Sequence, residues 1–171
     1  MAFTWEGIAQ FARMQALYAL DPDVILEQGP FDQSSAFFYA CKSGHKEAIK
    51  WLYSLDRSWL FDQVGGYQFK PANIRTPFIE ACRFADSKTV RLLAELDPIV
   101  LTQRDSFGFT GFYYLCCRNK VSDIKFLCTQ YNDQLEPFFR SHLPQFLGNP
   151  RIHASTQNVL NPVGYLFSFK S

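Results

Sequence analysis

The sequence has almost no excess of charge of either sign, because 17 lysine and arginine residues are balanced by 16 aspartate and glutamate residues. A protein that binds the nucleic-acid backbone needs a basic stripe, so this balance argues against nucleic acid as a partner. The chain also lacks an apolar run near the roughly 20 residues of a membrane span. Its first residues do not have the basic-then-apolar order of a secretory signal peptide. These absences favour a single folded domain in the cytoplasm.

Motifs for metal and phosphate chemistry are missing as well. The five cysteines have no paired Cys-x-x-Cys spacing for zinc, and Gly65-Gly66 is not followed by the Lys-Ser/Thr of a phosphate-binding loop. Cys117 with His142 or His153 would make a nucleophile and base, but no local signature accompanies them. We therefore expect no enzyme activity, no cofactor, no metal and no small-molecule substrate.

What the sequence does contain is one pattern that occurs three times. Residues 35–40, 76–81 and 110–115 read SAFFYA, TPFIEA and TGFYYL, with starts 41 and 34 residues apart. Each is followed at matching distances by a turn and a late leucine. The hydroxyl residue that opens each stretch is predicted to cap a helix, since its oxygen can accept from backbone donors without a partner. Pro77 suits a first helical position, where no N–H is needed.

A second helix is predicted in each repeat from apolar residues three apart, such as Ile49, Leu52 and Leu55. Ser87 and Ser122 stand near the starts of two of these helices and are predicted to cap them. Helices of about ten residues are too short to be stable alone, so neighbouring repeats must cover them. The repeated cysteines are predicted to pack in the core as small hydrophobes; they are Cys41, Cys82 and Cys116.

The pattern resembles the ankyrin repeat, whose period is near 33 residues and whose opening reads Thr-Pro-Leu-His-x-Ala. The opening at 76–81 nearly matches it, Gly44-His45 matches the turn between helices, and DSFGFT at 105–110 resembles the family's Asp-x-x-Gly-x-Thr hairpin. The histidine of the family opening is absent, and its place is taken by Phe38, Ile79 and Tyr113. The resemblance implies an all-α fold, an ankyrin-type helical solenoid with short β-hairpin fingers.

The repeat boundaries divide the single domain, residues 1–171, into four parts. Residues 1–33 are predicted to be a partial N-terminal repeat, and residues 34–131 three repeats. Residues 132–160 form an insert, and residues 161–171 start a further repeat or form a C-terminal cap. We expect the chain to be a fragment of a longer array, because a lone last helix leaves one face uncovered. Gly65-Gly66 predicts a two-residue turn in a long hairpin finger.

The resemblance also implies where a partner would bind, because ankyrin repeats present their first helices and fingers on a concave face. The chain places aromatic and charged residues at those positions, and such types dominate binding hot spots. The candidate contact residues are Tyr39, Lys42, Tyr67, Phe69, Glu80, Arg83, Phe107, Phe109, Tyr114 and Arg118. The alternative for the aromatic residues on the fingers is that they fold back onto neighbouring repeats.

The leading hypothesis is a protein–protein interaction module that binds a partner protein through the concave helix face and the hairpin fingers. In the alternative hypothesis, the chain is the targeting or adaptor segment of a larger multidomain enzyme or of a host-directed effector. An effector would act in the host-cell cytoplasm. Both hypotheses rest on the resemblance, since a fold alone does not dictate a function.

Overall fold

The computed structural model describes residues 8–28, 34–64 and 74–137, together with residues 152, 154, 156, 157 and 160. Most of these residues are helical, and within them β-structure is limited to two isolated bridges. The described fold is therefore all-α. Residues 1–7, 29–33, 65–73, most of the predicted insert at 132–160 and all of 161–171 lie outside the described residues.

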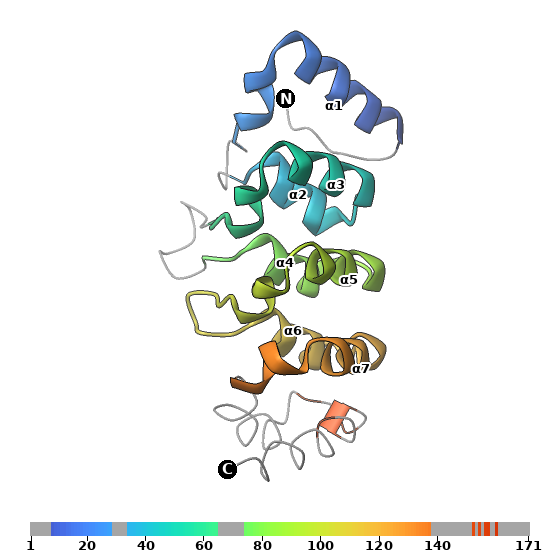
Figure 1. Ribbon diagram of the computed structural model, residues 1–171, viewed down its shortest axis with the longest axis vertical. Helices are drawn as coiled ribbons and strands as arrows, with labels where there is room; N and C mark the ends of the chain where they lie inside the picture. The colour runs from blue at the N-terminus through green and yellow to red at the C-terminus, as the bar shows by residue number, and fades with distance from the viewer. Residues whose placement is uncertain are drawn as a thin grey trace.

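The helices come in pairs that are stacked along the long axis of the molecule (Figure 1). The first element is α1 (Ile8–Leu20), followed by the 3₁₀ helix η1 (Pro22–Leu26). The pairs are α2 (Ala36–Ser43) with α3 (Lys46–Leu55), α4 (Pro77–Phe84) with α5 (Ser87–Leu96), and α6 (Gly111–Cys117) with α7 (Val121–Gln130). The other 3₁₀ helices are η2 (Arg57–Phe61) and η3 (Pro98–Thr102). Below, α2, α4 and α6 are called the first helices, and α3, α5 and α7 the second helices.

The first helices begin where the sequence predicts. Ser35, Thr76 and Thr110 each accept a hydrogen bond from the backbone N–H three residues later, at 3.2, 3.5 and 3.4 Å. Pro77 occupies the first turn of α4, where its missing N–H leaves no donor unpaired. These caps confirm the prediction made from the repeated hydroxyl residues.

The second helices begin differently from the prediction. Asp86, not Ser87, caps α5, since its carboxylate accepts from the Thr89 N–H at 2.8 Å. Lys120 precedes α7 and makes no side-chain cap bond, so the prediction for Ser122 is also wrong. At α5 a carboxylate one residue earlier is available as a capping acceptor.

A 3₁₀ helix follows α1, α3 and α5, and sequence analysis did not predict it. Each begins after an aspartate whose carboxylate accepts from the backbone N–H two residues on. These aspartates are Asp21, Asp56 and Asp97, with donor–acceptor distances of 3.1, 2.8 and 3.0 Å. An apolar pair lies three and four residues after each aspartate and packs against the core, and its second member is buried each time. These pairs are Val24-Ile25, Trp59-Leu60 and Val100-Leu101. The aspartate therefore directs the chain from a second helix back toward the core.

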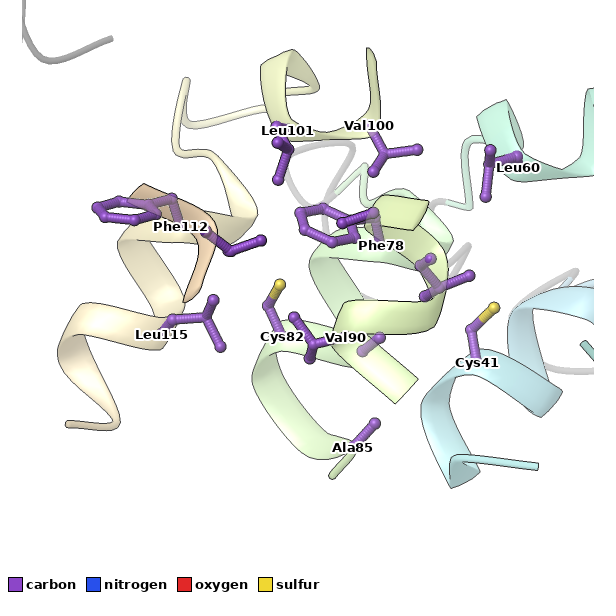
Figure 2. Close-up of a cluster of buried hydrophobic side chains, with 14 of the residues drawn as sticks. Cys41, Leu60, Phe78, Cys82, Ala85, Val90, Val100, Leu101, Phe112 and Leu115 are labelled. Carbon is purple, nitrogen blue, oxygen red and sulfur yellow. The ribbon is translucent and has the colours of Figure 1, made fainter. Parts of the chain in front are cut away.

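One continuous core runs through the stacked pairs (Figure 2). Phe37, Phe78 and Phe112 occupy equivalent positions of the first helices and are fully buried. Cys41, Cys82 and Cys116 are buried too, and burial raises the pKa of each thiol well above its ordinary value. The thiols therefore stay protonated and pack as apolar groups, as the sequence predicts.

The α1 helix packs against the stack through aromatic rings. The rings of Phe11 and Tyr18 meet Trp51 of α3 edge to face, with centroids 5.8 and 5.3 Å apart. A helix followed by η1 repeats the order of α3 and η2, so the described residues are compatible with a partial repeat. At the other end, Thr156 Oγ1 donates to Asn119 Oδ1 at 2.8 Å.

Each loop that leads into α4 or α6 closes with an antiparallel bridge, Val64 with Arg75 and Arg104 with Thr110. Both backbone groups of Val64 bond to Arg75, at 2.9 and 3.0 Å. A two-residue turn at Gly65-Gly66 would instead pair Val64 with the residue after the glycines. The register therefore differs from the predicted one, and the segment at 65–73 lies outside the described residues.

Candidate functional site

The row of first helices carries half of the predicted contact residues. Helix α4 packs against α2 on one side and α6 on the other, so the first helices form one row (Figure 1). Tyr39 and Lys42 lie on α2, Glu80 and Arg83 on α4, and Tyr114 on α6. Tyr39 is half-buried and Lys42 is exposed. Tyr67 and Phe69 fall outside the described residues.

Glu80 lies beneath the surface rather than on it, with an exposed fraction of 1%. Its carboxylate accepts two bonds from Arg75 Nη1, at 3.0 and 2.8 Å, and one from Arg83 Nη1 at 3.3 Å. A buried carboxylate needs such partners because it has lost its hydration. Glu80 therefore does not present its carboxylate for contact, and instead it holds two arginines at the surface of α4.

Cations and rings alternate across the surface from α2 to α6. The Lys42 ammonium lies 5.7 Å from the centroid of the Phe84 ring. The Arg83 guanidinium lies 5.0 Å from the same ring and 5.2 Å from the Tyr114 ring. Such distances give cation–π attraction, worth about 0.5–1 kcal/mol each at exposed sites. Together with Phe109, these four residues are called the cation–aromatic strip.

Phe84 is the residue of the strip that sequence analysis missed. Its side chain is 52% exposed, although it is a large hydrophobe at the end of α4. It directly follows Arg83, so the repeat pattern contained its position. The equivalent residues of the other repeats are polar, Ser43 and Arg118. A large apolar residue at a position that is polar in the other repeats is the sequence signal that would have identified Phe84.

The loop before α6 adds an aromatic edge to the strip. Phe109 stacks on Tyr113, with ring centroids 4.2 Å apart and planes 13° from parallel, and meets Tyr114 edge to face at 6.4 Å. Phe109 nevertheless stays 39% exposed. Phe107, at the tip of the loop, is 58% exposed. The sequence left open whether aromatic residues on the fingers face a partner or fold back onto neighbouring repeats. Phe109 packs on its own repeat, and Phe107 points outward.

Asp105 fixes this loop to α6. One carboxylate oxygen accepts from the N–H groups of Phe107 and Phe109, both at 2.9 Å, and the other accepts from the Tyr114 hydroxyl at 2.6 Å. Burial and the bond to Asp105 raise the pKa of Tyr114, so the phenol remains a donor. Gly108 has φ +81°, a left-handed conformation that glycine adopts without strain. The loop and helix therefore form one rigid part of the surface.

Arg118 ties α6 to α4 at the end of the row. Its Nη1 donates to the Cys82 carbonyl oxygen at 2.9 Å, across neighbouring repeats. It lies one helical turn after Tyr114, and Cys117 beside it is half-buried against the core. The predicted contact residue Arg118 is thus exposed and also anchored.

The strip and the residues beside it carry a positive charge. Arg75, Arg83 and Glu80 together contribute one net positive charge, and Lys42 and Arg118 add to it. Among the described residues, no carboxylate oxygen lies within 4.0 Å of the charged nitrogens of Lys42 or Arg118. The surface therefore combines apolar rings with two cations, Lys42 and Arg118, that have no carboxylate partner within the part of the chain that the structure describes.

Known proteins supply no further guide to this surface. Comparison with models of protein families, with curated proteins and with solved structures finds no match. Among the residues that the structure describes, no group of His, Cys, Asp and Glu is arranged to hold a metal ion. In the same part of the chain, no helix has the length and apolar character needed to cross a bilayer.

Proposed function

We propose that this chain is a protein-interaction module of the ankyrin-repeat type, which binds another protein through its first helices and the adjoining loops. The repeated sequence pattern and the stacked helix pairs support the ankyrin assignment. In this proposal the chain has no chemistry of its own and works in the cytoplasm.

The observation that carries the proposal is the continuity of the cation–aromatic strip. Lys42, Arg83 and Tyr114 come from three successive helix pairs. Cation–π contacts join Lys42 to Phe84, and Arg83 to both Phe84 and Tyr114. Aromatic and arginine side chains supply most of the energy at protein interfaces. A surface of these residues that is built from several repeats suits a partner protein that lies across the row.

Affinity capture from a eukaryotic lysate tests the proposal. Wild-type protein is compared with Phe84→Ala, and Ile99→Ala serves as the matched control because Ile99 is also 52% exposed but lies on η3. Captured proteins are identified by mass spectrometry, and circular dichroism checks that each variant is folded. We expect a protein that is enriched by wild type and by Ile99→Ala and is lost with Phe84→Ala.

The proposal has a clear failing outcome. If every enriched protein is retained by Phe84→Ala and also by Phe109→Ala, the strip is not an interface. The exposed ring of Phe84 would then be one of the scattered surface hydrophobes that are common in soluble proteins.

A further inference from the structure

We propose that the segment bound by the cation–aromatic strip is an acidic peptide segment of the partner protein, with an apolar side chain between its carboxylates. This inference rests on the proposed function and names the chemistry of its partner. Carboxylates would meet Lys42, Arg83 and Arg118, and the apolar side chain would cover the exposed ring of Phe84.

The first argument is the uneven sharing of Glu80. Arg75 contacts both carboxylate oxygens, at 3.0 and 2.8 Å, whereas Arg83 contacts one oxygen at 3.3 Å. Arg75 alone can balance the single negative charge of Glu80, and it is also the arginine with the closer contact. Arg83 can therefore turn to a carboxylate of the partner and lose less interaction energy with Glu80 than Arg75 would lose.

The second argument is the combination of charge and apolar surface around one ring. Lys42 and Arg83 both lie within 6 Å of the Phe84 centroid, yet half of the Phe84 side chain is exposed. A partner carboxylate that reaches either cation brings its neighbouring residues over this ring. Arginine also offers paired donors that match a carboxylate. The site thus fits acidic residues on either side of an apolar one.

A single-stranded nucleic acid would also bring negative charge, but the rings are poorly placed for it. Base stacking requires aromatic faces that are open to the base. The Phe84 ring has two cations beside it, the Tyr114 ring has Arg83, and Phe109 is stacked on Tyr113. The cations beside the Phe84 and Tyr114 rings leave only part of each ring open. An apolar side chain can cover that part, whereas a base needs a whole open face to stack, so a peptide is the better fit.

A displayed random peptide library tests the charge of the occupant. The library is selected on the wild-type chain, and the peptides recovered are sequenced and measured by fluorescence anisotropy. We expect Asp and Glu to be enriched around an aromatic or aliphatic residue. Lys42→Glu should raise the Kd of such a peptide about tenfold. Lys50→Glu on α3 makes the same change of charge at an exposed residue of a second helix and should leave the Kd unchanged.

The outcomes separate this inference from the proposed function. Neutral or basic peptides that require Phe84 would overturn the acidic occupant and leave the interaction module standing. If no peptide depends on Phe84 or Lys42 while Phe84→Ala still loses a captured protein, the inference alone fails; if the captured proteins are also unaffected by Phe84→Ala and Phe109→Ala, both proposals fail. A fluorescent oligo-thymidine that binds wild type, loses affinity with Lys42→Glu and outcompetes the acidic peptides would overturn the inference in favour of nucleic acid.

Discussion

Neighbouring first helices and neighbouring second helices make contact in different ways. Between α4 and α6, Gly111 approaches Phe78 so closely that an added Cβ would lie 2.6 Å from a ring carbon of Phe78 and 2.8 Å from Cys82 Sγ. Between α5 and α7, the buried carboxylate of Asp123 accepts from Ser87 Oγ at 2.6 Å and from Arg91 Nε at 3.2 Å. In the buried part of the stack, the first helices thus meet through apolar contact at close range, and the second helices also through polar side chains.

The α3–α5 contact follows the second pattern. The Tyr53 hydroxyl donates to the Leu96 carbonyl oxygen at 3.2 Å, and Lys46 pairs with Asp86 at 3.2 Å. Apolar contact depends on volume, whereas hydrogen bonds and ion pairs depend on charge state and on pH. The contact between neighbouring first helices should therefore be sensitive mainly to the size of buried side chains, and the contact between neighbouring second helices also to ionisation.

The largest effect is expected from added volume in the first-helix row. Gly111→Val should lower the free energy of unfolding by about 3 kcal/mol, because its side chain would overlap the buried ring of Phe78. Gly111→Ala should cost less, because it adds one carbon at this contact whereas valine adds three. Urea unfolding followed by circular dichroism measures both changes.

A double-mutant cycle gives the control for this prediction. If the clash with Phe78 is the cause, Phe78→Leu should cost less in the Gly111→Ala background than in wild type, because the smaller side chain makes room. Equal costs in both backgrounds would show that Gly111 does not limit the approach of α6 to α4.

A smaller effect is expected from the polar contact in the second-helix row. Asp123→Ala should lower the free energy of unfolding by about 2 kcal/mol, because Ser87 and Arg91 lose their shared acceptor. The cost is less than for a fully buried ion pair, since Arg91 can still reach water. Asp133→Ala, at an exposed position, is the control for a lost carboxylate. Equal stability of the two variants would contradict the role of Asp123.

The smallest effect is a pair of pH dependences with opposite signs. Burial raises the pKa of Asp86, but hydrogen bonds from Thr89 and Lys46 outweigh it, so the pKa is lowered overall. Asp86 therefore stabilises the fold above about pH 4 and loses this contribution as the pH falls through its folded pKa. Burial raises the pKa of Asp62, more than its bond from Ser35 lowers it. The contribution of Asp62 is present below about pH 4 and is lost as the pH rises through its folded pKa.

Asparagine variants measure these two contributions separately. As the pH falls, the stability difference between wild type and Asp86→Asn should shrink, since asparagine keeps the cap but not the charge. As the pH rises, Asp62→Asn should gain stability relative to wild type. Thermal unfolding across a pH series records both trends, and the same sign for both variants would refute the assignment.

Local patterns allowed much of the fold to be predicted. Ser35, Thr76 and Thr110 precede their helices as hydroxyl residues, and each acts as the expected cap. The prediction failed at Ser87 because Asp86, one residue earlier, supplies the capping acceptor. Ser87 instead donates to Asp123, 36 residues away in the sequence, and local sequence patterns cannot predict a contact between residues so far apart.

The candidate site was less predictable, because burial of its charges depends on other segments. The helix position of Glu80 predicts a surface residue, but Arg75 reaches back from the preceding loop to pair with it. Arg83 was predicted correctly to lie on the first-helix row, while its stacking on Tyr114 requires the next repeat to be in place. Sequence patterns thus predict which residues lie on the first helices, and the contacts between repeats determine which of their side chains remain exposed.

The aspartates that cap the 3₁₀ helices bear on how a chain of this kind changes its length. The stretch from Asp56 to Leu96 is entered through one such capped turn and left through another, at Asp97. Duplication or loss of a stretch with these limits leaves every junction with its own carboxylate and its own inward apolar pair. Each capping aspartate lies within two residues of the backbone N–H that it bonds. Recombination can therefore alter the number of helix pairs without leaving such a backbone donor unpaired.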